Sequence, residues 1–437
     1  MSALALGTAI FILVYVLIVI EKWHKTAIAL GGASLVLLLK LVTQEEAFHS
    51  VEYGVDWNVI FLLIGMMIII SIMRETGVFQ WTAIKSAKLG KGEPFLIMAI
   101  FAVVTAFVSA FLDNVTTVLL IAPVTIAVAK QLEVDPVPYL IVEALASNIG
   151  GTATLIGDPP NIMIGSRAQL PFNAFVEHLT PVIIVALIAF VITIRFIWGK
   201  NLKTRPELKA RVLAMDESQA ITDRPLLVKS LAVTGLVLIG FVLHDQLGFQ
   251  PATIALVGAA LLLLWSRQEP HKVLHEVEWT SLFFFIGLFI VVGAVVKVGL
   301  IGILAKKALA LTAGNLFGTS MLVLWFSAFA SAIIDNIPYV ATMNPLIIDM
   351  AKELWPGETG LALLHHKDLL PIWWSLALGA CLGGNGTAIG ASANVIVCGL
   401  SEKAGYPITF RRFTLYGMPL MIESVAISMI YIWWRYY

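Results

Sequence analysis

The sequence predicts an all-α polytopic membrane protein built from two inverted-topology repeats, each with a re-entrant hairpin and a discontinuous transmembrane helix. Three observations predict this fold class. Of the 437 residues, 59% are hydrophobic and 13% are charged, and the mean hydropathy of +0.91 lies far from a soluble globular composition. Apolar runs long enough to cross a bilayer recur along the chain. Motifs of the first half return in the second half.

The apolar runs set the expected helices and the organisation of the chain. Spans are predicted at 3–20, 26–42, 57–73, 180–198, 227–246, 251–266, 279–297 and 413–434, with longer, interrupted apolar blocks at 94–166 and 319–400. The first run lacks a basic flank and a small-residue cleavage site, so we expect a retained helix rather than a signal peptide. The polar stretch 199–226 predicts a cytoplasmic linker between a first membrane repeat (1–198) and a second one (227–437).

The two halves keep a common register. Asp113-Asn114 recurs as Asp335-Asn336, and Gly150-Gly151 recurs as Gly383-Gly384. The offset between matching positions is constant up to the Asp-Asn pairs and beyond, and it grows once, near 353–368, where the second half carries an insertion. A register held over most of each half indicates internal duplication.

The placement of Lys and Arg predicts how the halves are oriented. With the N-terminus outside, most Lys and Arg fall in inner segments, as in other membrane proteins. This orientation makes the repeats inverted. It also requires 94–131 and 319–352 to enter and leave on one side, as re-entrant hairpins with Asp-Asn at each tip.

Two buried aspartates and two Gly-rich stretches predict a polar site at membrane depth. Ionisable groups there are costly and usually functional, and backbone freed at helix breaks needs protein or a water-lined cavity. Paired breaks in inverted repeats are a recurrent transporter plan. The predicted side chains are Asp113, Asn114, Thr116, Thr117, Asn148, Thr152, Thr154, Asp158, Asn161, Asp335, Asn336, Asn385, Thr387, Ser392 and Asn394, with backbone at Gly150, Gly151, Gly157, Gly383, Gly384, Gly386 and Gly390.

The chemistry of this set limits the solute. Hydroxyl, amide and carboxylate oxygens suit Na⁺, although they define no firm metal site. A carboxylate can carry a proton, and Asp113, Asp335 and Glu143 are the candidates. The set contains no Lys, Arg or His, so a neutral polyhydroxy solute fits better than an organic dicarboxylate.

Other interpretations of the same residues remain open. Asp113 and Asp335 could cap helix breaks, the glycines could serve close packing, and Asp158, replaced by Ala391 in the second half, could be a loop residue. An ion channel or a membrane scaffold are further alternatives. The zero formal net charge argues against a nucleic-acid partner, and no nucleotide-binding motif occurs. We therefore expect a transporter rather than an enzyme, with no cofactor beyond a coupling ion, H⁺ or Na⁺.

Four strings carry a family resemblance. FLDNVTTVLLIAPVTI (111–126), SNIGGTATLIGDPPNIMI (147–164), IDNIPYVATMNPL (334–346) and GACLGGNGTAIGASANVIV (379–397) resemble the ion transporter superfamily. Within it they resemble the arsenite-pump and sodium/proton-antiporter (ArsB/NhaD) permeases, in wording closest to the branch with the melanosomal P protein. The match covers nearly the whole chain.

The resemblance implies secondary transport by a multi-pass protein of a prokaryotic inner membrane, with both Asp-Asn pairs and the Gly/Asn/Thr stretches at the central site. The leading implied function is proton-coupled efflux of arsenite or antimonite, whose neutral hydroxide form suits a site without a fixed cation. A Na⁺/H⁺ antiporter is the alternative, followed by an inorganic anion permease or channel. The implied partners are the small inorganic solute and the lipid bilayer, and an arsenical ATPase subunit could couple to such a permease.

Overall fold

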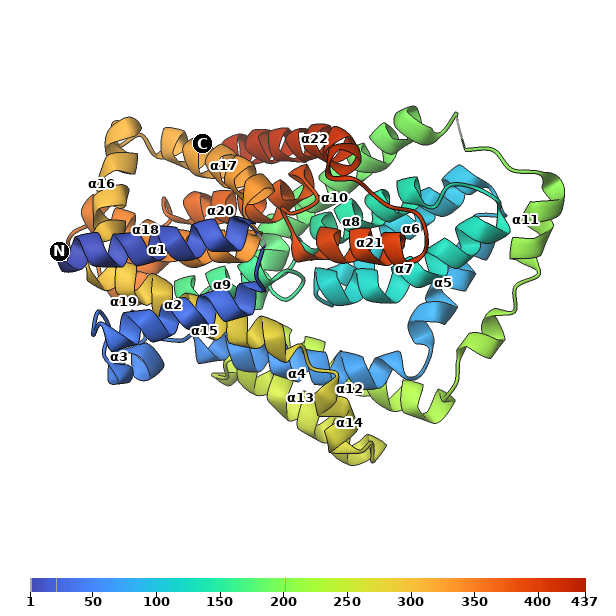
Figure 1. The fold of residues 1–437 in the computed structure, drawn as a ribbon, viewed down its shortest axis with the longest axis horizontal. Coiled ribbons are helices and arrows are strands. Elements are labelled where there is room, and N and C mark those ends of the chain that lie inside the picture. The colour runs from blue at the N-terminus through green and yellow to red at the C-terminus, as the bar shows by residue number, and fades with distance from the viewer. Residues whose placement is uncertain (1, 21, 201) are drawn as a thin grey trace.

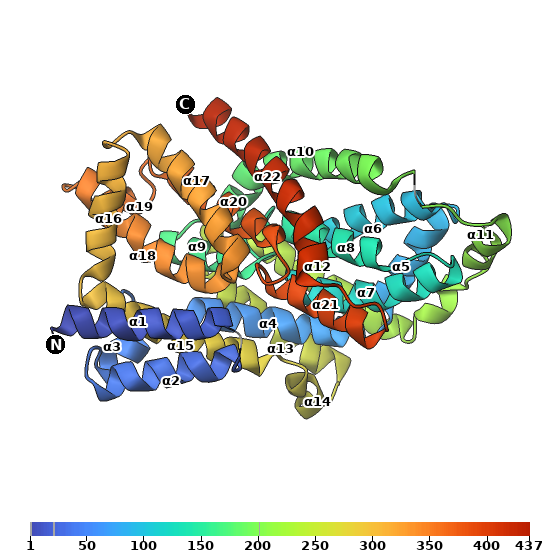
Figure 2. The same cartoon turned by 45° about the horizontal axis from the view of Figure 1, so that its top comes forward.

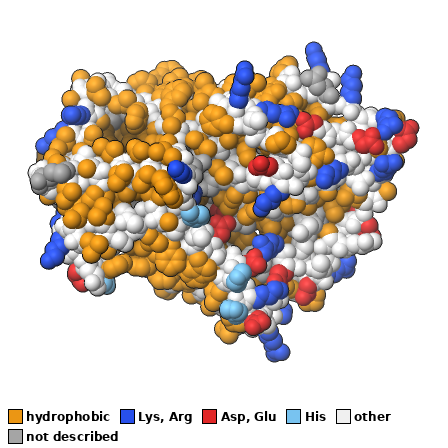
Figure 3. Space-filling view, in the orientation of Figure 1, with side chains coloured by type: hydrophobic (Ala, Val, Ile, Leu, Met, Phe, Trp, Pro, Cys, Tyr) orange, Lys and Arg blue, Asp and Glu red, His pale blue; other side chains and the backbone are white. Residues whose placement is uncertain are grey.

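The computed structural model describes residues 2–20, 22–200 and 202–437. Met1, Glu21 and Asn201 belong to the predicted first repeat and linker and lie outside the described residues. Within the described ranges every regular element is helical, and eight helices are long and apolar enough to cross a membrane. Figure 3 shows apolar side chains over the left and centre of one face, with charged ones gathered toward the right end and lower edge. The predicted all-α membrane architecture is confirmed.

The first half contains ten helices in the described ranges. They are α1 (Ala3–Ile20), α2 (Lys25–Leu38), α3 (Gln44–His49), α4 (Trp57–Arg74), α5 (Val78–Leu89), α6 (Pro94–Ser109), α7 (Asn114–Gln131), α8 (Val137–Gly151), α9 (Pro159–Ala168) and α10 (Phe172–Trp198). We call α6 and α7 hairpin 1. The pair α8 and α9 forms the first broken helix. The connection to the second half carries α11 (Pro206–Leu213) and the short η1 (Glu217–Ala220).

The second half repeats this order with one added helix. It contains α12 (Arg224–Leu247), α13 (Pro251–Ser266), α14 (Pro270–His275), α15 (Trp279–Lys297), α16 (Leu300–Leu311), α17 (Leu316–Ile333), α18 (Asn336–Leu354), the added α19 (Gly360–Leu364), α20 (Leu370–Gly383), η2 (Gly384–Gly386), α21 (Ser392–Lys403) and α22 (Phe410–Tyr436). We call α17 and α18 hairpin 2. The pair α20 and α21 forms the second broken helix.

Helix boundaries preserve the register of the repeat. The helices α15 to α18 begin at one constant offset from α4 to α7, and α20 and α21 begin at one slightly larger offset from α8 and α9, because α19 intervenes. Figures 1 and 2 place α5 and hairpin 1 toward the right and α16 and hairpin 2 toward the left. Corresponding elements therefore lie at opposite ends of the molecule, and the predicted inverted repeats, re-entrant hairpins and discontinuous helices are confirmed.

Local chemistry explains several of these boundaries. Gly77 and Gly299, at the same position in the two repeats, have φ of 76° and 87°, a conformation that glycine adopts without steric cost. They turn the chain sharply from α4 into α5 and from α15 into α16. Pro159 opens α9, where its missing N–H would have no partner within the helix.

The helix α10 begins earlier than the predicted span at 180–198. Its first residues include Glu177 and His178. Their polar side chains lower the mean hydropathy of this stretch, so the predicted span begins after them. The structure gives both a partner on α22, since Arg435 donates to Glu177 over 3.3 Å and Tyr436 Oη lies 2.7 Å from His178 Nδ1.

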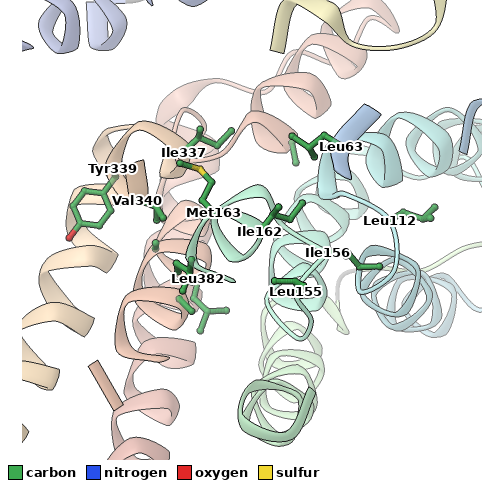
Figure 4. Packing of buried hydrophobic residues seen from close by; sticks show 14 of the residues in the cluster. Leu63, Leu112, Leu155, Ile156, Ile162, Met163, Ile337, Tyr339, Val340 and Leu382 are labelled. Atoms are coloured by element: carbon green, nitrogen blue, oxygen red, sulfur yellow. The ribbon is translucent and has the colours of Figure 1, made fainter. Parts of the chain in front are cut away.

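The helices pack in two groups. In the first, α6 packs on α8, α17 on α20, α9 on α18 and α21 on α7, so each broken helix contacts both hairpins. We call the hairpins and broken helices the core unit. Figure 4 shows Met163 of α9 beside Ile337 and Val340 of α18, which are buried. In the second group, α2 packs on α15 and α4 on α13. These helices, with α1 and α12, form the flanking unit.

Candidate functional site

A cavity of about 610 Å³ lies where the two units meet, a volume typical of small-molecule sites. Both hairpin tips line it through Asp113, Asn114, Asp335 and Asn336, and Asp158 at the start of α9 lines it as well. The flanking unit contributes residues of α1, α2, α4 and α15. The structure thus brings the two Asp-Asn pairs of the sequence to one chamber.

Asp158 joins the two tips. Its Oδ1 accepts a hydrogen bond from Asn114 Nδ2 over 3.3 Å, and Asn336 Nδ2 lies 3.4 Å from each of its oxygens. The side chain is fully buried. Asp158 is therefore a buried residue of the cavity wall and not a surface-loop residue, and the second repeat has Ala391 in its place.

A network of amides crosses the repeats behind the cavity. Asn148 Oδ1 accepts from Asn114 Nδ2 over 2.9 Å. Its Nδ2 donates to Asn385 Oδ1 over 2.9 Å and to Asn394 Oδ1 over 3.1 Å. Asn385 Nδ2 in turn donates to the Leu145 carbonyl over 3.2 Å. Buried amides of this kind are stable only when their partners are complete, so the network fixes how the two broken helices meet.

The breaks themselves are held by side chains at matching positions. Asn161 Nδ2 donates to the carbonyls of Thr152 (3.1 Å) and Thr154 (2.8 Å). Asn394 Nδ2 donates to those of Gly384 (2.8 Å) and Thr387 (2.9 Å). These donors satisfy carbonyls that the helix break frees.

The predicted threonines have backbone partners too. The Thr154 hydroxyl donates to the Ala110 carbonyl, the Thr387 hydroxyl to that of Ala332, and the Thr152 hydroxyl to that of Asn148 over 2.7 Å. These donors are taken, so we assign the threonines a role in building the chamber.

The predicted glycines bring backbones together rather than form left-handed turns. A Cβ on Gly150 would lie 2.0 Å from the Ala106 carbonyl oxygen, and one on Gly383 would lie 2.5 Å from that of Ala328. Each would press into the hairpin of its own repeat. The other predicted glycines are confined to different degrees. A Cβ on Gly151, Gly157, Gly386 or Gly390 would come within 2.6 Å of a neighbouring atom, and one on Gly384 would come within 3.1 Å.

The two tip aspartates have different partners. Asp113 accepts from the backbone N–H of Thr116 over 2.8 Å and from the Thr116 hydroxyl. Asp335 Oδ2 accepts from Lys25 Nζ over 2.8 Å and from Ser392 Oγ over 2.9 Å. The expectation of a site without a fixed cation is therefore wrong. The sequence placed Lys25 at the start of a span, where a lysine indicates membrane orientation, and no local pattern shows that it reaches residue 335.

Glu278 is a second lining residue that the candidate set omitted. Its Oε2 accepts from Ser281 Oγ over 3.1 Å. A signal existed, because Asp56-Trp57 recurs as Glu278-Trp279. The inverted repeat sends the two acids to opposite ends, and Asp56 accepts from Ser166 Oγ of α9 over 2.9 Å outside this cavity.

The proton-coupling candidate Glu143 lies outside the residues that line the cavity. It is buried on α8, where it accepts from the Thr125 hydroxyl of α7. Among the described lining residues, the ionisable groups are the acids Asp113, Asp158, Glu278 and Asp335 and the base Lys25. With all of them ionised, the chamber is strongly negative. Within the described ranges no group of three His, Cys, Asp or Glu residues could hold a metal ion.

Comparisons with known proteins identify the kind of molecule. A family model described as a citrate transporter (CitMHS) matches residues 15–379. An uncharacterized transporter of Mycobacterium bovis is 47% identical over 99% of this chain and 98% of its own length. The human P protein is 34% identical over 99% of this chain, which spans 60% of that protein.

A solved structure shares the fold. The YdaH transporter of Alcanivorax borkumensis matches 99% of this chain and 98% of its own with a TM-score of 0.58 and 13% identity. At that identity the match shows the architecture alone. It agrees with the two-repeat helical arrangement described above.

Proposed function

Because this chain belongs to the citrate transporter family within the ion transporter superfamily, we propose that it is a proton-coupled secondary transporter with its solute site between the hairpin tips. One observation carries the proposal, namely that Asp113, Asp158 and Asp335 line one cavity at the meeting of two units. Carboxylates at membrane depth are suited to proton relay, and paired breaks in inverted repeats suit alternating access. It is an integral multi-pass membrane protein, and we place it in a bacterial inner membrane because its relatives include bacterial transporters.

The leading solute is arsenite or antimonite as the neutral hydroxide. Its hydroxyl groups can donate to carboxylate oxygens and accept from the amide of Asn336, which faces Asp158. A neutral solute enters a negatively charged chamber without repulsion. Release of protons from the same carboxylates would couple efflux to the proton gradient.

Free citrate, to which the family description points, fits this chamber less well. The citrate trianion would meet four acids and a single base among the described lining residues. That base, Lys25, already pairs with Asp335 at 2.8 Å. The same charge balance disfavours a free inorganic anion, because like charges in a low-dielectric site repel strongly.

A Na⁺/H⁺ antiporter is the second candidate, and the number of acids lining the cavity favours it. Carboxylate, amide and backbone oxygens are ligands that Na⁺ accepts. The described residues bring no three acids together around a point, so Na⁺ would need mixed ligands and a closure of the chamber. This requirement places the antiporter second.

Reconstituted vesicles that contain a pH-sensitive dye test the proposal. We expect a pH change when arsenite is added, and none with Na⁺, Li⁺ or citrate. Vesicles with the Asp113→Asn variant should show no pH change. The Lys22→Gln variant, which changes an exposed lysine, should give the same pH change as the wild type. A response to Na⁺ or Li⁺ alone would replace the leading solute by the second candidate. Arsenite uptake without proton movement would overturn proton coupling.

A further inference from the structure

Lys25 connects the flanking unit to the tip of hairpin 2. It is the first residue of α2, a helix that packs on α1 and α15. Its Nζ lies 2.8 Å from Asp335 Oδ2 and donates to Ser392 Oγ over 3.0 Å. The same ammonium lies 5.0 Å from the centre of the Phe284 ring, within the range of a cation–π contact. Three elements thus hold one cation in the wall of the chamber.

The donors around Asp335 leave little room for another cation. Its Oδ1 accepts from the backbone N–H of Ile337 over 3.1 Å, and its Oδ2 accepts from both Lys25 and Ser392. A cation or proton that binds Oδ2 must therefore displace the ammonium. A neutral, protonated carboxyl group cannot form the ion pair at all.

The first repeat has no equivalent arrangement. Asp113 takes its hydrogen bonds from Thr116 of its own helix, and among the described residues no Lys or Arg lies within 4 Å of it. The helix that corresponds to α2 by order is α13, which begins with Pro251. The cation is an asymmetric addition to a symmetric frame.

The charges that face Asp335 come from several elements. Asp113 lies on the tip of hairpin 1, Asp158 at the start of α9, and Glu278 at the start of α15. Each attracts a cation into the chamber, and among the described lining residues only Lys25 opposes them. The Lys25 side chain is 33% exposed and that of Asp335 is 12% exposed, so the pair is sheltered and still reachable from the chamber.

We propose that Lys25 is a tethered cation that competes with the coupling cation for Asp335. When Asp335 is unloaded, the ion pair neutralises it and fastens the core unit to the flanking unit. When Asp335 binds its proton or metal cation, Lys25 is released and the two units separate at this contact. The ion pair rests on the observed geometry alone, whereas the competition rests on the proposed function.

A labelling experiment tests the ion pair without any transport. Purified protein in nanodiscs is treated at pH 8 with a small amine-acylating reagent, and the modification of each lysine is followed by mass spectrometry. We expect Lys25 to react roughly tenfold faster in Asp335→Asn than in the wild type, the change expected for a sheltered ion pair. Lys22, three positions away and exposed, is the internal control. Equal Lys25 reactivity in both proteins would overturn the proposal, whatever the protein transports.

Flux measurements test the competition. In Lys25→Gln the proton concentration that gives half-maximal solute-driven flux should fall about tenfold. The midpoint pH of the flux should therefore rise by about one unit. Lys25→Arg keeps the charge and should stay near the wild type, as should Lys22→Gln. An unchanged proton dependence in Lys25→Gln, with faster Lys25 labelling in Asp335→Asn, would keep the pair and overturn the competition. If wild-type vesicles move no protons, the same comparison is made with Na⁺ as the coupling cation.

Discussion

The two hairpin tips use the same Asp-Asn pair in different ways. Asp113 caps α7 through donors of its own helix, whereas Asp335 caps α18 and also contacts a lysine of the flanking unit. The repeat supplies two equivalent tips, and a residue that is not part of the shared motif gives one of them an additional contact. In an inverted repeat, two copies of the same motif can therefore differ because of the residues that surround them, while the motif itself stays unchanged.

The largest expected effect comes from Asp113→Asn, which separates capping from proton coupling at the first tip. Asparagine caps helices about as well as aspartate, so the variant should fold. It should lose proton-coupled flux by roughly a hundredfold or more, since a proton carrier is removed. The solute-driven pH change in vesicles measures this, with gel filtration as the check of folding. Wild-type flux would reduce Asp113 to a helix cap and make Asp335 the sole proton carrier at the tips.

The next largest expected effect is a loss of stability when the close glycine contacts of the two repeats are disturbed. Gly150→Ala and Gly383→Ala each place a methyl group against hairpin backbone, at 2.0 Å and 2.5 Å from the nearest carbonyl oxygen. Overpacking of this kind costs about 1–3 kcal/mol, and Gly150→Ala should be the more severe. Thermal unfolding in detergent measures the change. Gly399→Ala on α21 is the matched control, since a Cβ there meets nothing within 4 Å. Equal stability of Gly150→Ala and Gly399→Ala would contradict the close contact.

A smaller difference is expected between the asparagines that hold the breaks. Asn161 and Asn394 each donate to two backbone carbonyls. Asn394 Oδ1 also accepts from the amide of Asn148 over 3.1 Å, whereas Asn161 Oδ1 accepts only from the weaker donor Cys381 Sγ over 3.5 Å. Loss of that acceptor leaves a buried donor with one partner fewer, so Asn394→Ala should destabilise the protein by about 1 kcal/mol more than Asn161→Ala. In an Asn148→Ala background the two variants should become equal. A difference that persists in that background would show that the inter-repeat bond is not its cause.

The smallest effect concerns the linker, which packs on α5 of the first repeat through η1 and α11. Glu217 lies 3.2 Å from Lys85 and also pairs with Lys88, and hydrogen bonding to these lysines lowers the pKa of Glu217 to about 2. A lowered pKa in the folded state means that the contact contributes above the unfolded pKa and is lost as the pH falls through about 2.

Protease sensitivity of the linker measures that contact. At neutral pH, Glu217→Gln should speed tryptic cleavage within 203–211 by a few-fold, since an exposed ion pair contributes little. Cleavage near Lys306, on α16 of the second repeat, should not change. Identical cleavage of the linker in both proteins would show that Glu217 does not hold it.

Much of the architecture could be predicted from the sequence, because hydropathy and an internal register report directly on membrane helices. The predicted spans 251–266 and 279–297 match α13 and α15 residue for residue. The start of α10 was missed because its polar residues find partners on α22. Such partners are tertiary contacts, which a local pattern does not contain.

Of the predicted side chains, the two Asp-Asn pairs, Asp158 and Ser392 line the cavity. The Asp-Asn pairs meet as expected, because the repeat fixes where the tips lie. Several predicted ligands, Asn161 and Thr387 among them, instead satisfy freed backbone, a distinction that residue type does not reveal. Lys25 was missed because its contact spans 310 positions of the chain.

The inter-repeat amide network has a consequence for biosynthesis. Asn148 is made 246 residues before its partner Asn394. At translation rates of roughly 5–20 residues per second, the first broken helix waits about 10 to 50 s in the membrane before that partner exists. During this time its amide must be satisfied by water, lipid headgroups or the insertion machinery. The newly made first half therefore depends on these temporary partners. The amide network between the repeats is completed only when synthesis is nearly finished.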